Sequence, residues 1–140
     1  MSLDVFKTAV VRCEHFNAAH RLHNENWSNE KNEAVFGKCN NPNFHGHNYD
    51  LEVKVIGLCD EETGYVIDTK VLGSMIQKSV VEVFDHKNLN LDVPYFKSMN
   101  PTTENVAKVI YEILRSQINN ELELKIKLYE TPRNYVEYPY

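Results

Sequence analysis

The sequence lacks the long apolar runs and the excess of basic residues that mark membrane proteins and nucleic-acid-binding proteins. None of its apolar runs approaches the roughly 18 residues that a membrane helix needs. Residues 1–9 include charged side chains and no long apolar stretch, so we expect no signal peptide. The formal net charge of −5 argues against nucleic acid as a partner, because a phosphate backbone calls for a basic face.

Glycine, proline and cysteine are also scarce. Five glycines and five prolines are spread over 140 residues without a repeat, a linker or a low-complexity tract, so we expect a single domain over residues 1–140. The three cysteines, Cys13, Cys39 and Cys59, are odd in number and widely spaced, which excludes a disulfide framework. This pattern favours a reducing compartment, and we expect a cytoplasmic protein.

The hydrophobic pattern predicts four strands and two helices. Strands are predicted for residues 6–16, 47–58, 122–129 and 135–138, where β-branched residues concentrate or polar and apolar residues alternate. Helical spacing is found in residues 70–84 and again after Pro101, where Thr102 or Thr103 is the expected N-cap and Glu104 lies in the first turn. Residues 24–43 are polar and aperiodic and predict a long loop.

The resulting order, β-β-α-α-β-β, predicts an α+β fold. Paired strands and paired helices favour a four-stranded antiparallel sheet covered on one face by two helices. Such a sheet leaves two edges free to pair with other chains, so we expect an oligomer.

Histidines supply the strongest chemical signal. If a strand begins at His45, the imidazoles of His45 and His47 point to one face and can chelate one metal ion. His20 is the favoured third ligand, because it shares the parity of Phe16 and Ala18 if the first strand continues. His15 and His23 compete with it for this role.

The spacing of Cys39, six residues before His45, leaves two roles open. As a fourth zinc ligand, Cys39 would make the site closed and structural. As a thiolate beside the metal, it would accept protons near neutral pH. Cys13 and Cys59 lie in strand contexts and are interpreted as core residues.

Acidic residues complete the candidate site. Asp85 and His86 end the first predicted helix, where the carboxylate either orients the imidazole or simply marks a helix end. Glu130 continues the inward phase of its strand, and a carboxylate on an apolar face needs a partner. It is either a strand end or, as we favour, the acceptor for an N–H and amino pair on a heterocycle.

Together, these segments resemble the 6-pyruvoyl-tetrahydropterin synthase family, in its animal-type form, from about residue 6 to residue 138. The most specific run is Cys39-Asn-Asn-Pro-Asn-Phe-His45-Gly-His47. The other matching segments are Phe16-Asn-Ala-Ala-His20-Arg-Leu, Asp85-His86-Lys-Asn-Leu, Thr102-Thr-Glu104-Asn-Val and Tyr129-Glu130-Thr. One departure is Phe44, where the family often has glycine, and its ring would narrow the pocket beside the first ligand of the pair.

The resemblance implies a T-fold and a homohexamer, a dimer of trimers with active sites between subunits. It implies that His20, His45 and His47 bind Zn²⁺ and that Cys39 is the proton-abstracting base. Asp85 and His86 would form a relay that a neighbouring chain donates, and Glu130 would anchor a pterin with Thr102, Thr103 and Glu104 around the same pocket.

The implied activity is that of a carbon–oxygen lyase in tetrahydrobiopterin biosynthesis, which converts 7,8-dihydroneopterin triphosphate to 6-pyruvoyl-tetrahydropterin and triphosphate. Three alternatives remain at this stage. A carboxy-tetrahydropterin synthase would use the same histidines and thiol, although the Asn-Asn-Pro-Asn run after Cys39 favours the first activity. A structural zinc site with Cys39 as fourth ligand would leave Glu130 and the Asp85–His86 pair without a role, and a metal-free pterin carrier would leave the histidines unexplained.

Overall fold

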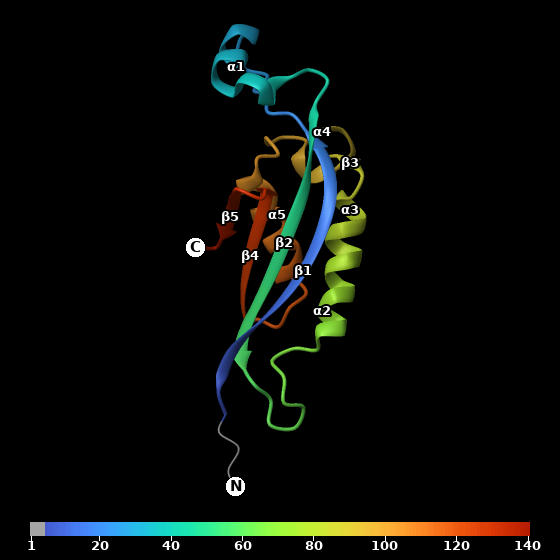
Figure 1. Ribbon diagram of the computed structural model, residues 1–140, viewed down its shortest axis with the longest axis vertical. Coiled ribbons are helices and arrows are strands. Elements are labelled where there is room, and N and C mark those ends of the chain that lie inside the picture. Colours follow the sequence, from blue (N-terminus) through green and yellow to red (C-terminus); the bar gives the residue numbers. More distant parts are fainter. Residues whose placement is uncertain (1–4) are drawn as a thin grey trace.

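The computed structural model describes residues 5–140 and shows a twisted sheet with helices on one face (Figure 1). Four of its strands each pair antiparallel with the next one in this order: β1 (Lys7–His20), β2 (His45–Leu58), β4 (Glu123–Thr131) and β5 (Asn134–Tyr138). The fifth, β3 (Lys87–Asn88), pairs parallel with the end of β1, and the sheet order is β3-β1-β2-β4-β5.

The predicted four-stranded antiparallel sheet is therefore wrong in one respect, because the sheet is five-stranded and mixed. The α+β class and the order of the four long strands and the two main helices are as predicted. A two-residue strand is too short to show any periodicity, and β3 exists only because the backbone of Lys87 and Asn88 runs beside Ala18 and Ala19.

The hairpin of β1 and β2 forms the long axis of the sheet, with 14 residues in each strand. In β2 the predicted alternation holds: Tyr49, Leu51, Val53 and Val55 are fully buried, whereas the residues between them face outward. The same alternation continues in β1 through Phe16 and Ala18 to His20, four residues beyond the predicted strand end.

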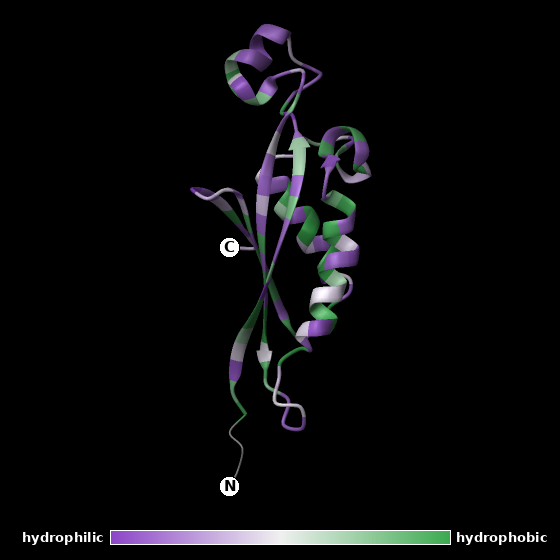
Figure 2. Ribbon diagram, turned by 45° about the vertical axis from the view of Figure 1, so that its right-hand side comes forward, coloured by the Kyte–Doolittle hydropathy of each residue, from purple (hydrophilic) through white to green (hydrophobic). Residues whose placement is uncertain are grey.

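Two long helical segments cover the buried face of the sheet (Figure 2). The first runs without a break through α2 (Thr69–Ile76), the π-helical turn η2 (Gln77–Val81) and α3 (Glu82–Phe84). The second, α5 (Thr103–Arg115), is capped by Thr102, whose hydroxyl accepts from the Asn105 N–H at 3.2 Å. Their apolar stripes and the inward residues of β1, β2 and β4 form one core.

The long loop predicted over residues 24–43 is also wrong, because it contains α1 (Asn29–Phe36) and the 3-10 helix η1 (Gly37–Asn40). The chain holds α1 by polar contacts instead of an apolar stripe, which is why periodicity missed it. Ser28 caps its N-terminus, and the buried Asn32 amide donates to the carbonyls of Asn24 and Ser28. The segment formed by α1 and η1 projects beyond the end of the β1–β2 hairpin (Figure 1).

Two short helices, α4 (Leu89–Asp92) and η3 (Pro94–Phe96), connect β3 to α5. α4 contacts β1, the strand that ends at His20, and η3 contacts α4. Among residues 5–140, the helices are all too short or too polar to cross a membrane.

Candidate metal centre and active site

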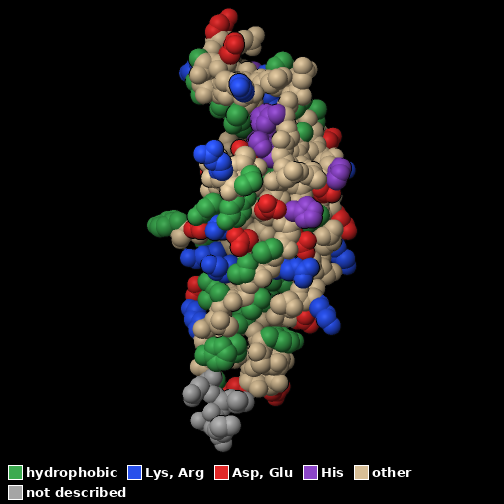
Figure 3. Space-filling model, in the orientation of Figure 1, with side chains coloured by type: hydrophobic (Ala, Val, Ile, Leu, Met, Phe, Trp, Pro, Cys, Tyr) green, Lys and Arg blue, Asp and Glu red, His purple; other side chains and the backbone are tan. Residues whose placement is uncertain are grey.

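The register of the β1–β2 hairpin brings three histidines together. His20 lies directly opposite His45, and the small Ala18 lies opposite His47, which leaves space for the second imidazole. One ligand nitrogen from each ring can be chosen so that all three lie within 4.8 Å of one another. Histidine side chains are visible at the surface near the end of the molecule that carries α1 (Figure 3).

His20 is fixed by the segment that precedes α5. Its side chain is buried, and Nδ1 lies 2.7 Å from the carbonyl oxygen of Pro101, to which it donates. The Tyr49 hydroxyl lies 3.4 Å from the same nitrogen. Because Nδ1 carries the proton, Nε2 presents its lone pair to the other histidines, which is the arrangement that a metal-binding imidazole needs.

The other two rings fit a metal centre as well. Nδ1 of His45 and Nε2 of His47 are buried without a hydrogen-bond partner among the described residues, a costly state for polar atoms unless a ligand satisfies them. Burial is the main cause that lowers the pKa of His20 and of His45, and the neighbouring His47 adds to the effect in both. His20 and His45 therefore favour the neutral form that binds a cation.

The group of described side chains placed to hold one ion consists of His20, His45 and His47, without Cys39. Cys39 lies in η1 with a half-buried side chain, and its carbonyl accepts from the Leu22 N–H at 2.8 Å, which ties η1 to the chain just after His20. Three protein ligands leave a coordination position open, as in catalytic zinc sites. The geometry thus gives no support to a closed site with four protein ligands.

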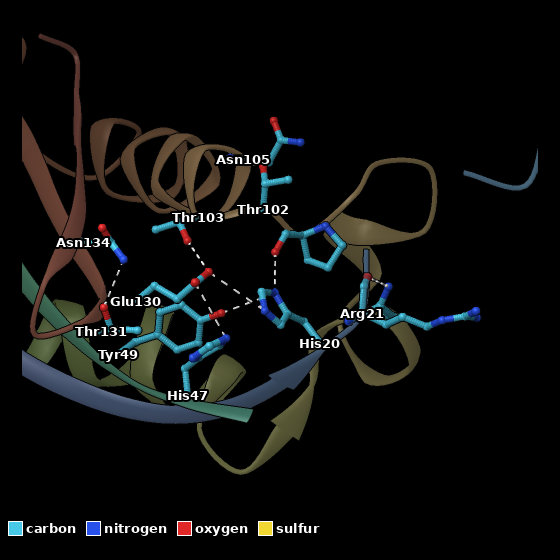
Figure 4. Close-up of polar contacts among 12 residues, drawn as sticks. His20, Arg21, His47, Tyr49, Thr102, Thr103, Asn105, Glu130, Thr131 and Asn134 are labelled. Atoms are coloured by element: carbon cyan, nitrogen blue, oxygen red, sulfur yellow. Dashed lines mark hydrogen bonds and ion pairs between the residues drawn. The ribbon is translucent and has the colours of Figure 1, made fainter. Parts of the chain in front are cut away.

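Glu130 faces the histidines from β4 (Figure 4). Its Oε2 lies 3.9 Å from Nε2 of His20, and its Oε1 lies 3.8 Å from Nε2 of His47. The strand register shifts between Tyr129 and Thr131, and an irregularity of this kind re-aims a side chain near a strand end. The carboxylate is 28% exposed, so it is open to a ligand as well as to the histidines.

Thr103 holds the Glu130 carboxylate in place. Its hydroxyl donates to Oε2 of Glu130 at 2.6 Å, and the Thr103 side chain is itself buried at the start of α5. A hollow of about 400 Å³ beside this pair is also lined by Thr102 and Glu104. Glu130 therefore shares one pocket with Thr102, Thr103 and Glu104, the residues predicted at the start of the second helix. Burial, with the charge of Glu130 as a second cause, raises the pKa of the buried Tyr49.

Asp85 and His86 lie at the β3 edge of the sheet, where the first long helical segment ends. Nδ1 of His86 lies 2.8 Å from Oδ2 of Asp85, and Oδ1 of Asp85 accepts from the Asn17 N–H at 2.8 Å. The Asn17 N–H, with the His86 bond second, lowers the pKa of Asp85. His86 is 78% exposed and shares a shallow hollow with His47, and within residues 5–140 no hydrogen bond joins the pair to the three histidines.

The remaining histidines are placed elsewhere. His15 is exposed on β1, on the sheet face opposite the core, and Nδ1 of His23 bonds to the Asn40 amide at 2.8 Å. Sequence reasoning missed the Pro101 carbonyl, since any residue supplies one, and it missed the role of Tyr49 beside His20. Phe44 has φ 67°, a left-handed conformation that glycine adopts at low cost.

The fold and the site define a small α+β domain in which three histidines are placed to hold one metal ion beside a carboxylate-lined pocket, an arrangement that suits an enzyme for a small molecule. Residues 9–139 match the 6-pyruvoyl tetrahydropterin synthase family, and the chain belongs to that family. It is 45% identical over 129 residues to the human 6-pyruvoyl tetrahydrobiopterin synthase, covering 92% of this chain and 89% of the human protein.

Further relatives agree with this assignment. The 6-pyruvoyl tetrahydrobiopterin synthase of Drosophila melanogaster is 43% identical over 130 residues, which cover 92% of this chain and 77% of the fly protein. The solved structure of the Caenorhabditis elegans 6-pyruvoyl tetrahydropterin synthase superposes with a TM-score of 0.90 at 40% identity, over 98% of both chains. The chain is thus an enzyme of this family in both sequence and fold.

Proposed function

We propose that this chain is a zinc-dependent lyase of tetrahydrobiopterin biosynthesis that converts 7,8-dihydroneopterin triphosphate to 6-pyruvoyl-tetrahydropterin and triphosphate. The observation that carries the proposal is the position of Glu130, whose two carboxylate oxygens lie 3.9 Å and 3.8 Å from the ligand nitrogens of His20 and His47. A pterin held by this carboxylate has its side chain next to the three histidines. Family membership supports the same substrate class.

Glu130 recognises the pterin ring. An ionised carboxylate accepts from an N–H and an amino group side by side, and these are the donors that a pterin offers. Thr103 donates to one oxygen and so fixes the plane of the carboxylate before the ligand binds. Thr102 and Glu104 line the same hollow, and we assign them to the rim of the pterin site.

His20, His45 and His47 hold Zn²⁺, which supplies Lewis acidity to the hydroxyl groups of the substrate side chain when bound. The Pro101 carbonyl keeps the His20 proton on Nδ1, so Nε2 remains a ligand atom through the reaction. A Lewis acid is needed because the carbon-bound protons of the substrate's side chain are barely acidic.

Cys39 is the base that removes a carbon-bound proton, and Asp85 and His86 relay protons. Nδ1 of His86 is bound to Asp85, so the other ring nitrogen is free to exchange a proton with the substrate or the thiol. Their exposed position at the β3 edge is the reason to propose that they serve the active site of a neighbouring chain, in a homohexamer built from two trimers. We place the enzyme in the cytoplasm, in keeping with its three unpaired cysteines.

The test of these roles compares the zinc-loaded protein with Cys39→Ala and Glu130→Gln. We expect Cys39→Ala to retain zinc and pterin binding but to lose turnover, and Glu130→Gln to retain zinc but to bind 7,8-dihydroneopterin weakly. Zinc content is measured by atomic emission and pterin affinity by fluorescence titration. Full turnover in Cys39→Ala refutes the base assignment, and unchanged pterin affinity in Glu130→Gln refutes the anchor.

A further inference from the structure

Residues 21–24 continue the chain past the end of β1, and side-chain amides bond to their backbone in place of a neighbouring strand. The amide of Asn90 bonds to both the N–H and the carbonyl of Arg21, at 2.8 Å and 2.9 Å. The amide of Asn32 bonds in the same way to Asn24, at 2.7 Å and 2.9 Å. An asparagine can do this because one side chain carries both a donor and an acceptor. Residues 21–24 are therefore fixed by polar contacts.

Cys39 is attached to this same segment. The four residues of η1, which include Cys39, are all exposed or half-buried, so packing in the core does not fix them. Instead, the Cys39 carbonyl accepts from the Leu22 N–H at 2.8 Å. Leu22 lies two residues beyond His20, so this bond ties the backbone of Cys39 to the chain that leaves the three histidines.

Asn40 completes the attachment with both its backbone and its side chain. Its carbonyl accepts from Nε of Arg21 at 3.0 Å. Its side-chain Nδ2 donates to the Leu22 carbonyl at 2.8 Å and lies 2.8 Å from Nδ1 of His23. An amide nitrogen carries two hydrogens, so it donates the second one to Nδ1 of His23. One side chain thus binds two successive residues of the segment.

The chemistry of these two bonds requires an amide at position 40. A serine has one hydroxyl hydrogen and an ionised aspartate has none, so neither can bond to both acceptors. With the Asn40 amide in place, η1 binds both the N–H and the carbonyl of Leu22. The 3-10 helix therefore cannot move along the segment without breaking at least one hydrogen bond.

We infer that Asn40 is a positioning residue for Cys39, and that its side-chain amide fixes where the thiol lies relative to the three histidines. The inference rests on the proposed role of Cys39 as the base. Asn40 acts through the backbone of its neighbour in the chain and needs no contact with the substrate. Such a role matters because a displacement of about 1 Å in a reacting group can slow a reaction roughly 100-fold.

Three variants separate this role from a general effect on the loop. Asn40→Ala removes both hydrogen bonds of the side chain and leaves the backbone contacts in place. His23→Phe removes only the acceptor of the second bond, and it provides the test if Asn40→Ala does not fold. Asn43→Ala is the matched control, because Asn43 is exposed and bonds to Asn41 through its backbone N–H, at 2.9 Å, which the change retains.

The first measurement is the rate at which iodoacetamide alkylates Cys39 in the zinc-loaded protein, read from the masses of its peptides. Cys39 is half-buried, so alkylation should be faster when η1 is released from the segment. Loss of two neutral hydrogen bonds should raise the rate about 30-fold in Asn40→Ala, and loss of one should raise it about fivefold in His23→Phe. Asn43→Ala should react at the wild-type rate.

The other two cysteines are internal references in the same samples. Cys13 lies in β1 and Cys59 directly follows β2, so neither belongs to η1. Their alkylation rates should be the same in the wild type and in all three variants. A change confined to Cys39 therefore reports movement of η1 alone.

The second measurement is turnover, which separates positioning from loss of folded protein. We expect kcat of Asn40→Ala to fall by about 10-fold to 100-fold, because the thiol acts in the chemical step. The zinc content, the affinity for 7,8-dihydroneopterin and the number of pterin sites per chain should stay at their wild-type values. Partial unfolding would instead lower kcat and the number of pterin sites together. Asn43→Ala should keep full turnover.

An unchanged rate of Cys39 alkylation in Asn40→Ala and His23→Phe, or an equal increase in Asn43→Ala, overturns the inference. So does a normal kcat in Asn40→Ala when Cys39→Ala is inactive. A parallel increase at the two reference cysteines also counts against it, because the whole fold has then loosened. Failure of the proposed function gives a different result, since Cys39→Ala then keeps its turnover while the alkylation rates still decide whether Asn40 holds Cys39 in place.

Discussion

Zinc should stabilise this protein by an amount that depends on His47. Nε2 of His47 and Nδ1 of His45 are buried without a hydrogen-bond partner among the described residues, so a bound ion satisfies atoms that are otherwise costly to bury. An ion that binds only the folded state at 100 times its dissociation constant adds about 2.7 kcal/mol to the free energy of unfolding.

This free energy converts into a measurable shift in Tm. With an unfolding entropy of roughly 2.1 cal/mol/K per residue, a chain of 140 residues has an entropy of unfolding of about 0.3 kcal/mol/K. The expected increase in Tm on adding zinc to the metal-free protein is therefore about 9 °C. In His47→Gln, where the dissociation constant exceeds the same zinc concentration, the gain is below about 0.4 kcal/mol, or about 1 °C.

The assay is differential scanning calorimetry of chelator-treated protein with and without zinc. His15→Gln is the matched control, because His15 is exposed on β1 and lies outside the group that could hold an ion. It should keep the full shift. A shift of the same size in His47→Gln and wild type, or no shift in the wild type at saturating zinc, refutes the three-histidine centre.

Three further outcomes follow from individual contacts. Thr103→Val removes the 2.6 Å hydrogen bond to Glu130 and should weaken binding of 7,8-dihydroneopterin by about 10-fold in a fluorescence titration with little change in zinc content, and unchanged affinity contradicts the orienting role. Asp85→Asn should lower Tm at pH 7 but not near pH 2. The pKa of Asp85 is lowered in the folded state, so its carboxylate adds stability above the unfolded pKa of 3.8, and this stability is lost as the pH falls through the folded pKa. A difference in Tm that does not depend on pH contradicts this linkage. Phe44→Gly should be about 1 kcal/mol more stable to urea than Phe44→Ala, because only glycine adopts φ 67° without a steric cost, and equal stabilities argue against strain at this position.

The sequence predicted the core strands well, because period-two alternation reports burial directly. The interpretation of Cys13 and Cys59 as core residues was wrong, because Cys13 is exposed and Cys59 is only half-buried. The parity argument for His20 depended on β1 continuing past Phe16, and the strand does run to His20. Parity also predicted that Glu130 faces inward, and the register shift next to it is a local feature that alternation does not contain. The three histidines and Glu130 could thus be brought together from sequence pattern.

The parts that sequence missed depend on contacts between distant backbone atoms. β3 is two residues long and is defined by its neighbour β1, and the His20 proton is positioned by a carbonyl oxygen 81 residues away. Helix α1 has no apolar stripe and is held by the Asn32 amide, so hydrophobic periodicity had no signal to detect. Polar networks of this kind become visible only when the fold is known.

The most direct test of the central claim is the reaction of the zinc-loaded wild-type protein with 7,8-dihydroneopterin triphosphate, followed by triphosphate release and by chromatography of the pterin product. The account predicts one triphosphate released for each 6-pyruvoyl-tetrahydropterin formed, and no release from metal-free protein. A protein that binds zinc through its three histidines and still releases no triphosphate, or that releases it equally well without metal, contradicts the account.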